Sequence, residues 1–97
     1  MPLIQLTPEI LEEKAANLEN TAQRNDDIVS RLDNLISALE ADWEGDAYNA
    51  FRTSYQAKRE KFQKFTLDMR EFAKYMRDFA DLMREEEKRQ TTAAQNL

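Results

Sequence analysis

Two long seams of regularly spaced apolar residues, separated by the only glycine, constrain the fold of this chain most strongly. The first seam advances in alternating steps of four and three residues from Leu11 to Trp43, and Asn25 is its polar member. The second follows the same steps from Phe51 to Met83 and contains all five phenylalanines. Such spacing is typical of helices that pack along their length. With one Gly and two Pro, the chain also has few residues suited to the turns between strands.

The stretch from Asp42 to Asp46 separates the two seams and contains the only tryptophan, Trp43. Glycine readily adopts the left-handed conformation just past a helix end, and aspartate is a favoured N-cap. We therefore expect Gly45 to end one helix, Asp46 to cap the next, and Trp43 to be buried at the corner. The expected single domain, residues 1–97, has a helix over about 8–42, a turn over 43–46, a helix over about 47–89 and a flexible tail over 90–97.

A chain that reverses at Gly45 brings together residues whose numbers sum to about 90. The first seam is mostly aliphatic and small and the second is aromatic and methionine-rich, so we expect large side chains of one helix to pack against small ones of the other. A ligand groove is the alternative for such an aromatic stripe. Lys58 interrupts the second seam near Asp33, either as a lysine with a packed stem and a solvated charge or as half of a polar pair that sets the register.

Two helices alone leave apolar surface uncovered, because Ile28 and Leu35 lie beside the first seam and widen its apolar face. The predicted fold is therefore all-α: an antiparallel helical hairpin that dimerises into an elongated four-helix bundle. Residues 1–42 carry a net charge of -6 and residues 46–97 one of +2, which favours antiparallel pairing of the helices. The residues predicted for the core and the dimer contact are Leu18, Ile28, Leu32, Leu35, Ile36, Phe62 and Phe65.

The composition argues against several classes of function. Without histidine or cysteine the chain lacks the commonest general base and the usual zinc ligands, and no catalytic group, metal site or cofactor motif is expected. A net charge of -5 argues against nucleic acid as a partner. No cleavable signal peptide and no segment able to span a membrane are visible. Residues 58–84 could lie on a membrane surface, but their interleaved acids weaken that alternative.

A Trp-x-Gly tripeptide, Trp43-Glu44-Gly45, in the middle of about 100 residues and between two amphipathic helices, resembles the WXG proteins. These are the early-secreted-antigen-like small substrates of type VII (Esx) secretion. The resemblance covers the whole chain and implies a secreted, extracellular protein that is exported without a cleaved signal peptide. It also implies a homodimer, a secretion ATPase as partner, larger co-secreted substrates that the dimer could escort, and a role in virulence or competition.

The family also has a C-terminal export signal, Tyr-x-x-x-Asp/Glu, which the resemblance places beside the partner's Trp-x-Gly. This sequence departs from it, because Phe79 stands four residues after Tyr75 and the nearest acids are Asp78 and Asp81. The candidate signal region is therefore Tyr75, Asp78, Phe79 and Asp81. A cytoplasmic coiled-coil adaptor without an export role is the alternative function.

Overall fold

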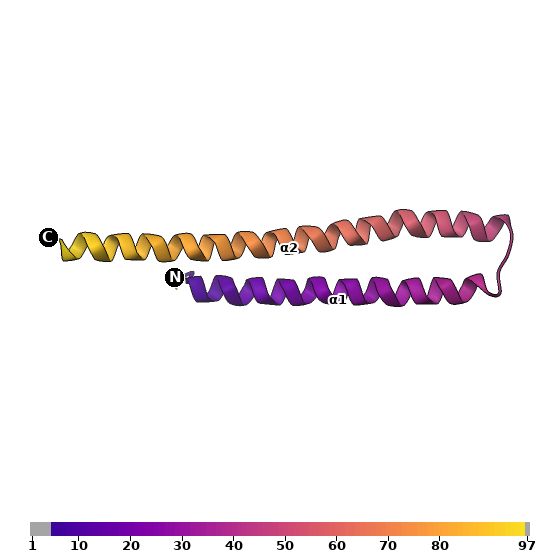
Figure 1. Cartoon of the computed structure of the whole chain (residues 1–97), viewed down its shortest axis with the longest axis horizontal. Coiled ribbons are helices and arrows are strands. Elements are labelled where there is room, and N and C mark those ends of the chain that lie inside the picture. The colour runs from indigo at the N-terminus through magenta and orange to yellow at the C-terminus, as the bar shows by residue number, and fades with distance from the viewer. Residues whose placement is uncertain (1–4, 97) are drawn as a thin grey trace.

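The computed structural model describes residues 5–96, which form two antiparallel helices joined by a short turn (Figure 1). Helix α1 spans Pro8–Glu40 and helix α2 spans Asp46–Gln95. The molecule measures 79 × 24 × 22 Å, with the turn at one end and the start of α1 and the end of α2 toward the other. The predicted all-α hairpin is confirmed. Within residues 5–96, neither helix has a stretch apolar enough to cross a bilayer.

The helix boundaries follow from local sequence, with one difference at the C-terminus. At the start of α1, Thr7 is the N-cap, and its Oγ1 accepts a hydrogen bond from the backbone N–H of Ile10 at 3.1 Å. At the other end, α2 continues to Gln95, well past the predicted boundary at residue 89. The prediction of a flexible tail is wrong for residues 90–95, which contain no Gly or Pro to stop the helix. Residue 97 of that predicted tail lies outside the described residues.

The turn uses Gly45 differently from the expected arrangement. Helix α1 ends at Glu40 and its C-cap, Ala41, has a right-handed conformation; the N–H of Asp42 bonds to the carbonyl oxygen of Leu39 at 3.1 Å. Gly45 is instead the N-cap of α2, with φ +113° and ψ -174°, and Asp46 is the first residue of that helix. This backbone region is almost restricted to glycine. Gly45 therefore directs the entry into α2 and does not terminate α1.

The contact between α1 and α2 is made mostly of small residues over the half that is far from the turn. Ala15, Ala22 and Val29 are buried on α1, and Thr66, Met69, Ala73 and Ala80 are buried on α2. The expected large-against-small packing is wrong for this half, because Phe65, Phe72 and Phe79 are 59%, 61% and 59% exposed. Small side chains let the two helices approach closely, and the phenylalanines of α2 lie outside their contact.

A change of phase in α2 explains this difference. Five acids spaced seven residues apart on α1 pair with arginines of α2: Glu40–Arg52, Asp33–Arg59, Asp26–Arg70, Glu19–Arg77 and Glu12–Arg84. The arginines are also seven apart, except that eleven residues separate Arg59 from Arg70. Four extra residues turn the helix by about 40° relative to a heptad repeat. The inner line of α2, which faces α1, therefore moves from the predicted Phe65, Phe72 and Phe79 to Thr66, Ala73 and Ala80.

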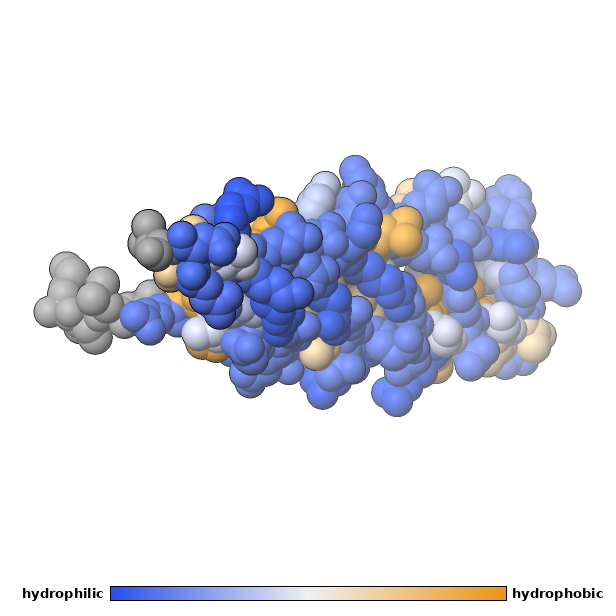
Figure 2. Space-filling model, turned by 60° about the vertical axis from the view of Figure 1, so that its left-hand side comes forward, coloured by the Kyte–Doolittle hydropathy of each residue, from blue (hydrophilic) through white to orange (hydrophobic). Residues whose placement is uncertain are grey.

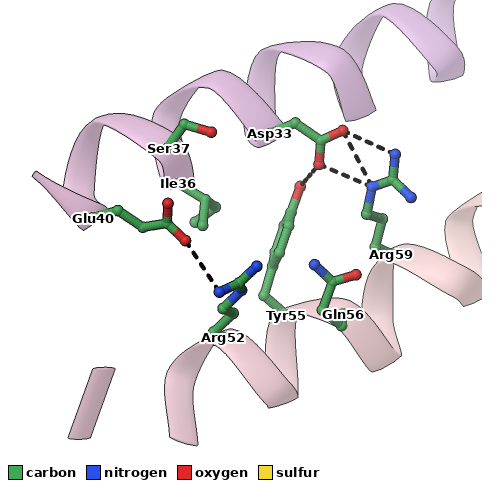
Figure 3. Close-up of a pocket in the computed structure, with 8 residues that line it drawn as sticks. All are labelled: Asp33, Ile36, Ser37, Glu40, Arg52, Tyr55, Gln56 and Arg59. Carbon is green, nitrogen blue, oxygen red and sulfur yellow. Dashed lines mark hydrogen bonds and ion pairs between the residues drawn. The ribbon is translucent and has the colours of Figure 1, made fainter. Parts of the chain in front are cut away.

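Two polar contacts flank this phase change. On the turn side, Asp33 accepts hydrogen bonds from Arg59 Nε and Nη2 at 2.9 and 3.0 Å and from the Tyr55 hydroxyl at 2.6 Å (Figure 3). Lys58, which was predicted to approach Asp33, is exposed. On the other side, Asn25 Nδ2 donates to Thr66 Oγ1 at 2.7 Å and to the Phe62 carbonyl oxygen at 3.2 Å. These directional bonds fix the register on both sides of the extra four residues.

We predict that Gly45→Ala destabilises the hairpin by about 1–3 kcal/mol, because an L-residue is strained in this backbone region. The strain comes from the backbone alone, since a Cβ built on Gly45 would meet no atom within 4 Å. Chemical denaturation followed by circular dichroism measures the change. Glu44→Ala is the matched control, because Glu44 has a negative φ and should unfold close to wild type. An unchanged midpoint for Gly45→Ala would contradict this conformation.

Acid should weaken the pairing of the helices. Hydrogen bonds from Arg59 and then Tyr55 lower the pKa of Asp33 below its ordinary 3.8, and Arg84 lowers that of Glu12 below 4.5. A carboxylate with a depressed pKa in the folded state stabilises the protein above its unfolded pKa and loses that effect as pH falls through the folded value. We expect the melting temperature to fall below about pH 4.5, with a shallower fall for Asp33→Asn. Parallel pH profiles for the two proteins would contradict a role for Asp33.

Candidate functional site

Three aromatic side chains pack together at the tip of the hairpin. The centroid of the Trp43 ring lies 5.5 Å from that of the Tyr48 ring, in an edge-to-face arrangement, and 5.4 Å from that of the Phe51 ring. Tyr48 is buried, and this burial, together with the nearby Glu40 carboxylate, raises the pKa of its hydroxyl. Trp43 was expected to be buried but is half-buried. It therefore anchors the turn and also keeps part of its surface accessible.

The rest of the Trp-x-Gly motif is open to solvent. Glu44 and Gly45 are exposed, and the turn projects at one end of an elongated molecule (Figure 1). This placement suits recognition by another protein, because exposed turns carried by a rigid scaffold often form binding sites.

The candidate signal region lies on the other half of the molecule. Tyr75 and Phe79 are 56% and 59% exposed, and Asp78 and Asp81 are also exposed. They belong to the stretch of α2 whose arginines, Arg77 and Arg84, pair with Glu19 and Glu12 of α1. Within a single chain, this region is therefore separated from Trp43 by much of the length of the hairpin.

The two long edges of the hairpin differ in chemistry. The acids paired with arginines, such as Glu19 and Asp26, stand four residues after the buried Ala15 and Ala22. On α2, Arg70 and Arg77 likewise stand four residues after Thr66 and Ala73. We call this side the ladder edge. Near the turn it has a groove, drawn in Figure 3, lined by Asp33, Ile36, Ser37, Glu40, Arg52, Tyr55, Gln56 and Arg59.

Large apolar side chains occupy the opposite side, which we call the apolar edge. They stand one residue before the inner line. A step back of one residue turns by about 100° around the helix, in the opposite sense from the turn of about 40° made by a forward step of four residues. Ile28 and Leu35 are 52% and 62% exposed on α1. The apolar edge consists of Ile28 and Leu35 on α1 and Phe65, Phe72 and Phe79 on α2.

Of the other residues predicted for the core and dimer contact, Ile36 lies on the inner line, and Leu18, Leu32 and Phe62 lie between that line and this edge. Leu18, Leu32 and Ile36 are half-buried by the hairpin itself, whereas Phe62 is 46% exposed. Orange apolar side chains also reach the largely hydrophilic surface in separate patches in the view of Figure 2. The hairpin therefore buries only part of its apolar surface.

This arrangement suits binding better than chemistry. Within residues 5–96, no group of acidic side chains has the geometry to hold a metal ion. The charged groups of the groove on the ladder edge are committed to one another: Arg59 to Asp33, and Arg52 to Glu40 at 3.5 Å. The exposed tip and the apolar edge remain as surfaces for another protein.

Comparison with known proteins agrees with this geometry. The sequence profile of a family described as proteins of 100 residues with WXG matches residues 3–96. The structure is similar to that of EsxB from Bacillus anthracis, described as a secreted protein, with a TM-score of 0.82 and 28% identity over 90% of this chain and 99% of EsxB. EsxA from Geobacillus thermodenitrificans gives a TM-score of 0.79 and 26% identity over 92% of this chain and 97% of EsxA.

No protein with a curated function matches the sequence significantly. The family profile nevertheless spans nearly the whole chain, and the similar structures share both its length and its hairpin. The chain therefore belongs to the WXG100 family, and it is a small Esx-type protein of the kind associated with type VII secretion, not an enzyme.

Proposed function

We propose that this protein is a secreted substrate of a type VII secretion system and that it is exported as a homodimer of folded hairpins. The observation that carries this proposal is the apolar edge, exposed along both helices of a chain that belongs to the WXG100 family. Export takes place without a cleavable signal peptide. Outside the cell, the dimer acts in virulence or competition or escorts larger substrates.

Dimerisation follows from the uncovered surface. Phe65, Phe72 and Phe79 form a row of rings spaced seven residues apart, and Ile28 and Leu35 continue the apolar surface on α1. Each such side chain stabilises an interface by about 1.5–3 kcal/mol when it is fully buried. A second copy presents the same surface, so two hairpins can cover each other in a four-helix bundle.

The dimer also provides a way to assemble the export signal. Trp43 and the region from Tyr75 to Asp81 lie on opposite halves of one chain. In a dimer whose turns point to opposite ends, the Trp43 of one copy lies beside the C-terminal half of the other copy's α2. The secretion ATPase then recognises a surface that neither chain has alone.

Deleting the secretion ATPase should remove this protein from the culture medium and leave it inside the cell. Fractionation of matched wild-type and ATPase-deficient cultures, with a cytoplasmic marker as the lysis control, measures the change. A cytoplasmic adaptor predicts the contrary result, in which the protein stays in the cell fraction of both cultures.

Trp43→Ala tests the role of the tip. We expect this variant to keep its helicity and its dimerisation, because both depend on the remainder of the hairpin. Its export should fall by 10-fold or more. Trp43→Phe is the matched control, because it keeps an aromatic ring against Tyr48 and Phe51. A Trp43→Ala protein that is folded, dimeric and exported at the wild-type level would show that Trp43 has no part in recognition.

A further inference from the structure

We propose that two copies pack with their α1 helices antiparallel about a two-fold axis at Ile28, and that Lys14 of each copy forms an ion pair with Asp42 of the other. This inference rests on the proposed homodimer with its turns at opposite ends, and it adds the register of the two copies and the residues that select it. The occupant of the apolar edge is thus a second copy of this chain.

The positions along the edge of α1 carry the argument. The residues one position before the inner line are Lys14, Thr21, Ile28, Leu35 and Asp42, spaced seven apart. Ile28 is at the centre of this row, and the two end positions are equally far from it. When the row is laid antiparallel on itself about Ile28, Thr21 faces Leu35 and Lys14 faces Asp42. In the antiparallel alignment, the row of one copy therefore sets a cation against an anion of the other copy at both ends.

Both end residues are available for such a contact. Lys14 and Asp42 are exposed, and within residues 5–96 neither of them makes an ion pair. Asp42 stands directly after Ala41, the C-cap of α1. The N–H of Asp42 bonds to the carbonyl oxygen of Leu39, and this bond holds Asp42 close to the end of the helix. Among the residues that the structure describes, this row of α1 thus has one unpaired cation, Lys14, and one unpaired anion, Asp42, at its two opposite ends.

The charge pattern also selects among orientations. A parallel alignment of the two rows would set Lys14 against Lys14 and Asp42 against Asp42, which is repulsive at both ends. The strongly negative charge of α1 does not oppose the antiparallel contact, because five of its acids face the ladder edge and are paired with arginines.

The centre of the row coincides with the apolar centre of α2. The ion pairs show which residues of α1 and α2 lie at the same level. Asp33 faces Arg59, so that the residue numbers sum to 92, and Asp26 faces Arg70, so that they sum to 96. Ile28 lies between these two pairs, at the level of Phe65, which is 59% exposed. The same axis that brings Ile28 against its copy therefore brings the two Phe65 rings near each other. Both helices contribute an apolar side chain to the middle of the interface.

This register has a consequence for the tip of the hairpin. An axis at Ile28 sets the turn of one copy, just past Asp42, at the level of the first turns of the partner's α1. Arg84 of α2 pairs with Glu12 at that level. Trp43 of one copy thus approaches the stretch of the partner's α2 that ends the candidate signal region.

Single cysteines test the position of the axis, because the natural chain has none. A disulfide needs Cα atoms within about 4.4–6.8 Å, so a single cysteine can link two copies only when it lies close to the two-fold axis. We expect I28C to form a covalent dimer under mild oxidation, L35C to remain mostly unlinked, and an equimolar mixture of T21C and L35C to cross-link. An unlinked I28C in a protein that sedimentation shows to be dimeric would overturn the inference and leave the homodimer intact.

Charge reversal tests the ion pairs. Each of K14E and D42K should weaken dimerisation by roughly 10-fold, because it sets like charges against each other at both ends of the row. The double variant K14E/D42K restores opposite charges and should recover the wild-type dissociation constant. The two positions lie about 42 Å apart along one chain, so such a rescue can act only between copies.

K14A/D42A is the matched control, since it removes the attraction without adding repulsion and should dissociate between the wild-type and single-reversal concentrations. A double reversal that is as weak as the single variants, in a protein whose wild type is dimeric, overturns the orientation alone. A wild type that sediments as a monomer overturns both the orientation and the homodimer on which it rests.

Discussion

The polar contacts on either side of the phase change in α2 determine what the rest of the molecule presents to its surroundings. Asp33 holds Arg59 and Tyr55, and Asn25 holds Thr66, with eleven residues between the arginine of one group and the next arginine of the ladder. Because of those extra residues, Ala73 and Ala80 of α2 face α1, whereas Phe65, Phe72 and Phe79 do not. Surface ion pairs each contribute only about 0.2–1 kcal/mol, so their main effect is to select one register among several.

As a consequence, the hairpin has one edge whose charged groups are paired and one edge whose apolar side chains are uncovered. Small residues fill the contact between the helices, the ladder edge pairs its own charges, and the apolar edge is left open. Had α2 kept a strict heptad repeat, its rings would have packed inside the hairpin and less apolar surface would remain. The same phase change that closes the hairpin thus leaves the apolar edge open, where we propose that a second copy binds.

Much of the fold could be predicted from the sequence, because it depends on strong local signals. Thr7-Pro8 marks the start of α1, the two seams indicate the helices, and the glycine between them indicates the turn. The inner face of α2 could not be obtained from the same regular steps, since Phe65 and Thr66 are adjacent and only long-range bonds decide which of them faces α1. The eleven-residue gap in the arginines against the even spacing of the acids was the one signal that could have revealed it. Helix α2 also continues past residue 89 because no breaker stops it, a signal that the charged run before it obscured.

We propose that the hairpin is half of a larger unit, completed when a second copy covers the apolar edge. Static light scattering on the purified full-length chain over a range of concentrations tests this proposal. We expect a mass of twice the 11.4 kDa of one chain, maintained down to micromolar concentration. A mass of a single chain at every concentration would contradict it, because the phenylalanines would then remain in water without a partner.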